Sequence, residues 1–169
     1  MTLGGRRGAM ISGLKPESVT WDEIDSMCAE LAEKVKKSGF GPDLIVGIGR
    51  GGWVPARLMS DMLGIDQILA MRIEFYNKPG KSPGVPVVTQ GVSRPAIIGR
   101  KILVVDDVSD TGESLEIAKG ELAAAKEVRI ATLHYKPHSK LKPDYYTRQT
   151  SAWIEYPWEK RETARALGR

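Results

Sequence analysis

Two short, almost uninterrupted apolar runs constrain the fold of this chain more than any other feature of its sequence. They are residues 43–48 (DLIVGI) and residues 102–105 (ILVV). A strand with one solvent-exposed face alternates apolar and polar residues, whereas a strand buried on both faces of a parallel sheet is apolar throughout. We therefore expect both runs to be central strands of a parallel sheet, with residues 68–75 and 128–134 as further strands.

Helical patterns lie between these runs. Residues 21–37 carry apolar side chains at spacings of three and four, and Thr20 and Glu23 have the spacing of a capping box. Further helices are expected over residues 54–63 and 111–125. Strands that alternate with helices in this way predict an α/β fold, with a mostly parallel twisted sheet flanked by helices.

The composition is that of a single globular domain. Of the 169 residues, 41% are hydrophobic and 27% are charged, and no apolar run approaches the ~20 residues that cross a bilayer. No apolar stretch follows Arg6 and Arg7, so a secretory signal is not expected. The only cysteine, Cys28, cannot form an internal disulfide and falls on the apolar face of the first helix. We therefore expect a cytoplasmic protein without a membrane partner.

Positive charge in this chain is modest overall and concentrated locally. The formal net charge is +4 and the basic residues do not form one block, so a polyanionic small molecule is expected as a partner and nucleic acid is not. Residues 76–100 hold four prolines and four glycines, and no acidic residue occurs between Phe75 and Val105. This stretch is too long for an ordinary connection. It is either a disordered surface insertion or a mobile basic lid that closes over an anion.

The segment from residue 102 to residue 114 (ILVVDDVSDTGES) places charged and small polar residues directly after a predicted buried strand. Asp106 and Asp107 would lie at the carboxyl end of that strand, where open α/β sheets bind their ligands. Hydroxyl groups, a glycine and the amino end of a helix then form a cradle for an anion. The two carboxylates would repel a bare phosphate, so a ribose 5-phosphate, with its hydroxyls on the carboxylates, fits better. The alternative is a solvated acidic turn without a ligand.

A second glycine-rich turn, residues 48–52 (IGRGG), follows the first predicted strand. Its glycines permit close approach of a ligand, and Arg50 adds a fixed positive charge. A turn of this kind is weak support on its own. Its place at the same edge of the sheet suits a pyrophosphate.

Recognition of a base would have to come from the C-terminal half. Lys136 follows the last predicted strand, and aromatic residues gather over residues 135–159, an otherwise irregular stretch. Trp153 could stack on a planar base, although core packing explains it equally well, and Lys136 could be an ordinary surface charge. His134 and His138 have no partners at metal-ligand spacing, and neither is expected to be catalytic.

The thirteen-residue segment resembles the signature with which type I phosphoribosyltransferases bind 5-phosphoribosyl-1-pyrophosphate (PRPP). That signature is a hydrophobic strand, two acidic residues, three variable positions, Thr-Gly and a hydroxyl residue. The resemblance implies the fold of that family, with Asp106 and Asp107 near the ribose hydroxyls and Mg²⁺. It also implies that Asp110 is the acid/base group at purine N7. The residues implied to bind the 5′-phosphate are Asp110, Thr111, Gly112, Glu113 and Ser114.

Other parts of residues 21–159 resemble the same family, most closely its xanthine-guanine and hypoxanthine (6-oxopurine) members. Residues 48–52 resemble the family's pyrophosphate loop, in which a non-proline cis peptide occurs, and Arg50 and Gly51 would hold the pyrophosphate. The Lys-Pro after the last strand and the segment WIEYPWE at 153–159 resemble the purine site. The implied roles are O6 recognition by Lys136, stacking by Trp153, recognition of the 2-position by the Ile154 carbonyl, and help from Glu159 in organising a second magnesium ion.

The resemblance implies a pentosyltransferase of purine salvage. PRPP and guanine, xanthine or hypoxanthine would give a nucleoside monophosphate and pyrophosphate, with Mg²⁺ as cofactor, in a homodimer or homotetramer. The chain would comprise a flexible tail (1–13), a PRPP-binding core (14–140) and a small C-terminal hood that recognises the base (141–169). Two alternatives stay open: a phosphoribosyltransferase for uracil, orotate or adenine, and a PRPP-binding regulator without catalysis.

Overall fold

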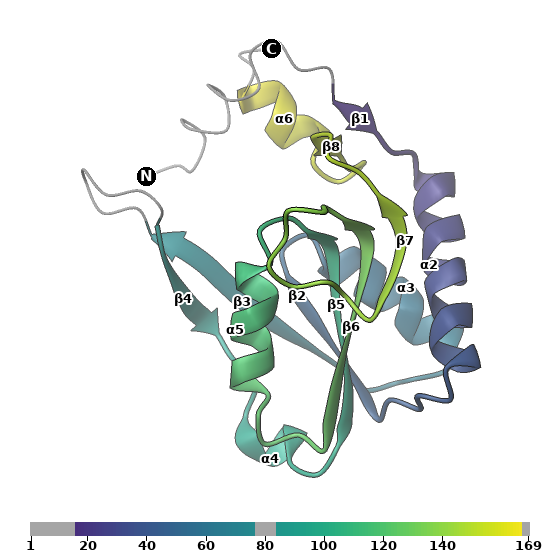
Figure 1. The fold of residues 1–169 in the computed structure, drawn as a ribbon, viewed down its shortest axis with the longest axis vertical. Coiled ribbons are helices and arrows are strands. Elements are labelled where there is room, and N and C mark those ends of the chain that lie inside the picture. Colours follow the sequence, from purple (N-terminus) through teal and green to yellow (C-terminus); the bar gives the residue numbers. More distant parts are fainter. Residues whose placement is uncertain (1–15, 77–83, 167–169) are drawn as a thin grey trace.

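The computed structural model describes residues 16–76 and 84–166, and its centre is a six-stranded sheet (Figure 1). The strand order is β4-β3-β2-β5-β6-β7. The β3–β4 pair is antiparallel, and the other neighbours run parallel. The predicted α/β fold with a mostly parallel sheet is thus confirmed. The strands are β2 (Leu44–Gly49), β3 (Ile68–Tyr76), β4 (Val85–Gln90), β5 (Lys101–Ser109), β6 (Glu127–Tyr135) and β7 (Tyr145–Gln149).

Helices cover both faces of this sheet and explain the uninterrupted apolar runs. Along β5, Leu103 and Val105 face one core with α2 and α3, while Ile102 and Val104 face the other core with α5. All four side chains are completely buried, so a polar residue at any of these positions would lose its contact with water. The helices are α2 (Trp21–Lys37), α3 (Trp53–Leu63), α4 (Arg94–Ile97), α5 (Glu113–Glu121) and α6 (Lys160–Ala166).

The first long helix, α2, begins and ends at the predicted residues. Thr20 Oγ1 accepts the backbone N–H of Glu23 at 3.2 Å, and the Glu23 carboxylate accepts the backbone N–H of Thr20 at 2.9 Å. Both bonds of the capping box are therefore present. Cys28 is buried on the face of α2 that packs into the core, as the apolar pattern predicts. Within the described residues, no helix combines the length and the apolar character needed to span a membrane.

Two elements of the segment predicted to bind phosphate differ from the prediction. The strand predicted over residues 102–105 is only the first half of β5, which continues because β6 pairs with it to the end of both strands. Asp106 and Asp107 therefore lie inside the strand rather than after it. The helix predicted over residues 111–125 is the shorter α5. Its start is delayed by Gly112, whose φ of +84° is incompatible with an α-helix.

The stretches predicted to be irregular contain regular structure. Residues 76–100 include β4, which returns antiparallel along β3, and the short helix α4. The described part of this stretch, residues 84–100, is therefore not a disordered insertion. Residues 77–83 of the predicted lid and the predicted tail at 1–13 lie outside the described residues.

The C-terminal segment is divided between the sheet and a small hood. β7 pairs with β6 and so belongs to the central sheet. Beyond β7, strand β8 (Ile154–Glu155) pairs with β1 (Glu17–Ser18) in a separate two-stranded sheet. Figure 1 shows this small sheet and α6 beyond the carboxyl ends of the central strands. The hood therefore lies over the edge of the main sheet at which the predicted ligand would bind.

Candidate active site

Asp106 and Asp107 form a buried acidic pair in β5. Each residue is 8% exposed, Asp106 Oδ1 accepts the N–H of Asp107 at 2.9 Å, and Asp107 Oδ1 accepts the N–H of Val108 at 2.8 Å. Burial, followed by the charge of Asp107, raises the pKa of Asp106 well above its usual value. A cation or hydroxyl donors at this position would favour the charged form of Asp106. The pair thus suits the ribose hydroxyls and the metal that the resemblance assigns to it.

The turn after β2 lies directly against this acidic pair. A Cβ on Gly51 would overlap the Asp107 carboxylate, so a side chain there would require the turn or the carboxylate to move. A cis peptide bond joins Gly49 to Arg50 in the same turn, as the resemblance predicts. The Arg50 side chain extends to Glu162 of α6, with 2.7 Å between Nη2 and Oε2. The predicted pyrophosphate residues are therefore next to the aspartates, and a carboxylate from the hood already contacts one of them.

The turn over residues 110–114 leads into α5 and has the form of an anion cradle. A Cβ on Gly112 would lie 2.7 Å from the backbone nitrogen of Leu141, so glycine permits close packing there. The Glu113 carboxylate points to Lys140, with an Oε1–Nζ distance of 3.3 Å, and does not line the cavity described next. A cavity of about 60 Å³ is lined by Asp106, Val108, Ser109, Asp110, Thr111, Gly112, Ser114 and Leu115.

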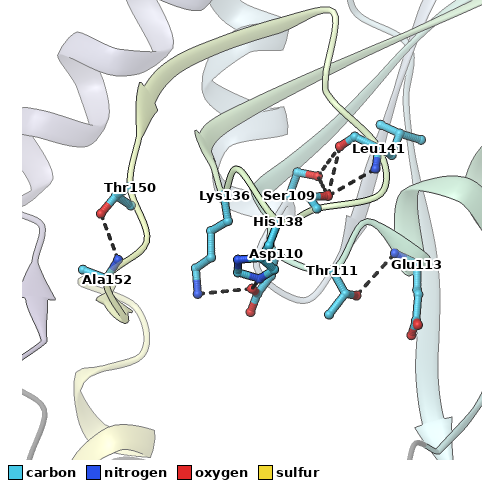
Figure 2. A network of polar contacts seen from close by, with 10 residues as sticks. Ser109, Asp110, Thr111, Glu113, Lys136, His138, Leu141, Thr150 and Ala152 are labelled. Carbon is cyan, nitrogen blue, oxygen red and sulfur yellow. Dashed lines mark hydrogen bonds and ion pairs between the residues drawn. The ribbon is translucent and has the colours of Figure 1, made fainter.

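Asp110 is approached by two side chains from the loop after β6 (Figure 2). Lys136 Nζ lies 3.2 Å from Asp110 Oδ1, and His138 Nε2 lies 3.1 Å from the same oxygen. The Lys136 side chain is only 11% exposed, whereas those of Asp110 and His138 are 52% and 59% exposed. The predicted O6 contact and the predicted acid/base group thus lie side by side. Sequence reasoning missed the third member, His138, which was expected to have no partners at metal-ligand spacing and no catalytic role.

The remaining residues of the predicted site, Trp153, Ile154 and Glu159, lie in the hood. Trp153 is half-buried, and its carbonyl and that of Glu155 both accept N–H groups from the segment that contains β1. Because successive carbonyls of an extended strand point in opposite directions, the carbonyl of Ile154 points away from β1. Glu159 lies close enough to Asp106 for its charge to contribute to the raised pKa of that carboxyl. Of these hood residues, Glu159 is therefore the one placed near the acidic pair.

A buried polar chain ties the hood to the acidic strand. The Tyr156 hydroxyl donates to the backbone carbonyl of Asp107 at 2.9 Å, and it accepts from His134 Nδ1, also at 2.9 Å. Trp158 stacks on the Tyr156 ring, with 4.9 Å between ring centroids and 4° between planes. Tyr156 and His134 were missed from the sequence. A histidine inside the apolar run of β6 is the signal that could have identified them, because buried polar groups need partners.

His134 should make the stability of the protein sensitive to acid. Burial lowers its pKa to about 4, while an unfolded histidine titrates near 6.5. The unfolded state therefore binds this proton more readily, so stability present above pH 6.5 is lost as the pH falls toward 4. We expect this residue to lower the free energy of unfolding by about 2 kcal/mol between pH 7 and pH 5.

Urea unfolding at the two pH values, followed by tryptophan fluorescence, measures this loss. His134→Gln, which retains a donor for Tyr156, is the matched variant, and its stability should fall by about 2 kcal/mol less over the same interval. An equal fall in both proteins would assign the acid sensitivity to other groups.

Comparisons with known proteins agree on one family. Residues 20–162 match the model of the phosphoribosyl transferase domain. The xanthine-guanine phosphoribosyltransferase of Cereibacter sphaeroides (strain ATCC 17025 / ATH 2.4.3) is 33% identical over 149 residues, which cover 83% of this chain and 85% of that protein. The hypoxanthine-guanine phosphoribosyltransferase of Schizosaccharomyces pombe (strain 972 / ATCC 24843) is 29% identical, with 83% of this chain and 87% of that protein covered.

A solved structure extends the likeness to three dimensions. The crystal structure of a purine phosphoribosyltransferase from Pyrococcus horikoshii Ot3 is similar with a TM-score of 0.77 and 36% sequence identity. The match covers 86% of this chain and 94% of that one. The family model spans the chain from the amino end of α2 into α6 and includes every residue of the candidate site. This chain therefore belongs to the phosphoribosyl transferase domain family.

Proposed function

We propose that this protein transfers the 5-phosphoribosyl group of PRPP to nitrogen N9 of a 6-oxopurine: guanine, xanthine or hypoxanthine. The products are a nucleoside monophosphate and pyrophosphate. The observation that carries this proposal is the Lys136–Asp110 pair at the mouth of the phosphate cradle. A cradle alone suits any ribose 5-phosphate ligand. A cation beside a carboxylate matches the purine edge on which O6 and N7 are neighbours, with a donor for O6 and an acceptor for a proton on N7.

In this proposal PRPP lies along the carboxyl edge of the sheet. Its 5′-phosphate occupies the cradle over residues 110–114, where backbone N–H groups at the amino end of α5 can donate to it. The ribose hydroxyls donate to Asp106 and Asp107. The pyrophosphate lies against the turn after β2, where Gly51 leaves room and Arg50 supplies a fixed positive charge.

The acidic pair also fits a magnesium ion. Mg²⁺ is usually held by one or two carboxylates together with water and substrate phosphates, rather than by a cage of protein ligands. Asp106 and Asp107 would hold it on one side, with Glu159 nearby on the hood. A bound magnesium ion supplies positive charge that stabilises the departing pyrophosphate.

The chemical step requires a proton acceptor beside the purine. As N9 bonds to ribose C1′, the bond from C1′ to pyrophosphate breaks, and Asp110 accepts the proton that leaves N7. Lys136 donates to O6, which orients the ring and draws electron density away from it. Trp153 stacks on the base, and the Ile154 carbonyl accepts from a donor at the 2-position. Arg50 stabilises the charge that develops on the leaving group.

Two other functions receive less support from the same site. Uracil and orotate lack the imidazole ring that carries N7, and adenine presents an amino group where Lys136 requires an acceptor. A PRPP-binding regulator would have no use for a carboxylate paired with a nearly buried lysine next to the cradle. Each alternative therefore leaves the Lys136–Asp110 pair without a role.

The direct test is a panel of six bases, each incubated with PRPP, Mg²⁺ and the protein while pyrophosphate release is measured. We expect turnover with guanine, xanthine or hypoxanthine, and background rates with adenine, uracil and orotate. Binding of PRPP without turnover on any base would indicate a regulator. Turnover with only one of the other bases would overturn the 6-oxopurine assignment.

Glu162 should compete with pyrophosphate for Arg50. Its carboxylate lies 2.7 Å from the guanidinium, so PRPP must displace it before Arg50 can contact the pyrophosphate. We expect Glu162→Gln to lower the KM for PRPP by about two- to fivefold at low salt, since exposed ion pairs contribute up to about 1 kcal/mol. The effect should shrink as salt screens the pair.

Steady-state kinetics at two salt concentrations measure this effect. Glu33→Gln removes a surface carboxylate that pairs with Lys36 and Lys37 on α2, so it serves as the matched control and should leave the KM unchanged. A KM that is equal or higher in Glu162→Gln would mean that Glu162 positions Arg50 for the substrate instead of competing with it.

A further inference from the structure

The loop after β6 is fixed to the phosphate-binding turn at two points. The N–H of Lys136 donates to the carbonyl of Ser109, and the N–H of Lys140 donates to the carbonyl of Thr111, both at 3.0 Å. These two bonds hold the segment 109–111 of the turn beside the segment 136–140 of the loop. The residue in the middle of one segment therefore lies opposite the residue in the middle of the other.

Side-chain bonds strengthen the same junction (Figure 2). The hydroxyl oxygens of Ser109 and Ser139 lie 2.8 Å apart, and Ser109 Oγ donates to the carbonyl of Leu141 at 2.7 Å. Gly112 packs against this part of the loop, where a Cβ would lie 2.7 Å from Ser139 Oγ. The loop thus contacts the turn through its backbone and its side chains. These contacts fix the relative position of the residues that lie between them.

The two middle residues are Asp110 and His138, and their side chains meet, with Nε2 3.1 Å from Oδ1. Lys136 Nζ reaches the same Oδ1 at 3.2 Å, so the two donors converge on one carboxylate oxygen. We propose that His138 is a positioning residue that holds the Asp110 carboxylate through Oδ1 when Lys136 turns to the purine. This inference rests on the proposed function and adds a third residue to its acid/base pair.

Asp110 needs a second donor because Lys136 must contact two acceptors in turn, the Asp110 carboxylate and the purine O6. Before the purine binds, its ammonium group is directed to Asp110. When a purine O6 arrives, that ammonium must move toward it, and the Asp110 carboxylate, which is 52% exposed, would then be able to rotate. A hydrogen bond from His138 keeps Oδ2 directed at N7.

The lysines next to this pair each contact a carboxylate. Lys140, from the same loop, pairs with Glu113 of α5 at 3.3 Å. Lys136, at the end of β6, is the cation in contact with Asp110, and Asp110 is the carboxylate in contact with His138. Among the described residues, the side-chain contacts to the Asp110 carboxylate therefore come from Lys136 and His138.

The test measures kcat and the KM for PRPP of the wild type, His138→Phe and His138→Gln near neutral pH, with guanine or whichever 6-oxopurine is used best at saturation. In His138→Phe we expect kcat to fall by about three- to tenfold, with the KM for PRPP within about twofold. His138→Gln restores a neutral donor and should restore kcat.

Two controls separate positioning from a structural role. Lys142→Gln changes an exposed residue of the same loop whose ammonium lies over the Tyr146 ring, and it should leave kcat and the KM for PRPP unchanged. In an Asp110→Asn background, His138→Phe should lower kcat by less than about twofold, because its target has been removed.

A rise in the KM for PRPP as large as the fall in kcat, an equal loss in the Gln and Phe variants, or a full additional loss in the Asp110→Asn background would overturn the role of His138. An active wild type with an unaffected His138→Phe variant would overturn this inference alone. A wild type that releases no pyrophosphate with any 6-oxopurine would overturn the proposed function, and this inference with it.

Discussion

Asp110→Asn is expected to lower kcat for nucleotide formation by about 10²- to 10⁴-fold, with little change in the KM for PRPP. Asparagine has nearly the same shape as aspartate, but its amide cannot accept the proton from N7. The side chain stays within reach of Lys136 and His138, so the cradle should keep its form. An interaction needed only in the transition state affects kcat and leaves ground-state binding intact.

Initial rates of pyrophosphate release, with both substrates saturating, measure the loss, and calorimetric titration with PRPP measures binding. Asp61→Asn on α3 is a suitable control, because that carboxylate is 77% exposed and its contact is a distant one of 3.8 Å with Arg57. Unchanged turnover in Asp110→Asn would mean that another group accepts the proton. Loss of PRPP affinity equal to the loss of kcat would place Asp110 in the phosphate site alone.

The central part of the fold could be predicted because the signals for it are local. The apolar runs of β2 and β5 reflect burial on both faces of the sheet, which depends only on each strand's own composition. The start of α2 follows from the capping box of Thr20 and Glu23, and the end of α3 follows from Gly64, whose φ is +67°. Each of these elements is specified by residues within a few positions of its ends.

The limits of β5 could not be read in the same way. Asp106 and Asp107 are polar, so a pattern of hydrophobicity ends the strand before them, yet pairing with β6 continues through Asp106, opposite Thr132. The strand is extended by backbone hydrogen bonds to a neighbour, which no local pattern records. The consequence for the site is burial: the acidic pair is nearly inaccessible to solvent, and the pKa of Asp106 is raised.

The parts of the site that the sequence did not predict depend on contacts between segments that are distant in the sequence. Arg50 meets Glu162 over 112 positions of sequence, and Tyr156 meets Asp107 over 49. Motifs identified Arg50 and Asp107 as members of the site, but their partners lie in the hood, whose position depends on the pairing of β1 with β8. The sequence could therefore name most of the groups that would touch the substrate. The groups that hold those residues in place required the structure.

The close approach of the turn after β2 to β5 leads to a second large effect, on both stability and activity. In Gly51→Ala the new methyl group would overlap the Asp107 carboxylate, so either the turn or the carboxylate must move. We expect the free energy of unfolding to fall by about 1–3 kcal/mol, as in other overpacked sites. We also expect kcat/KM for PRPP to fall by about 100-fold or more, because a displacement of ~1 Å in a reacting group can have an effect of that size.

Urea unfolding and steady-state kinetics measure the two losses. Gly120→Ala is the matched control, since a Cβ there meets nothing within 4 Å, and it should leave activity unchanged and stability unchanged or slightly increased. The double variant Gly51→Ala with Asp107→Ala separates the two causes. Removing the carboxylate relieves the overlap, so stability should recover relative to Gly51→Ala, while activity should stay low because the ribose and metal side of the site has lost a ligand. Recovery of neither quantity would mean that the methyl group clashes with the backbone of β5 and that Asp107 is not what requires a glycine at position 51.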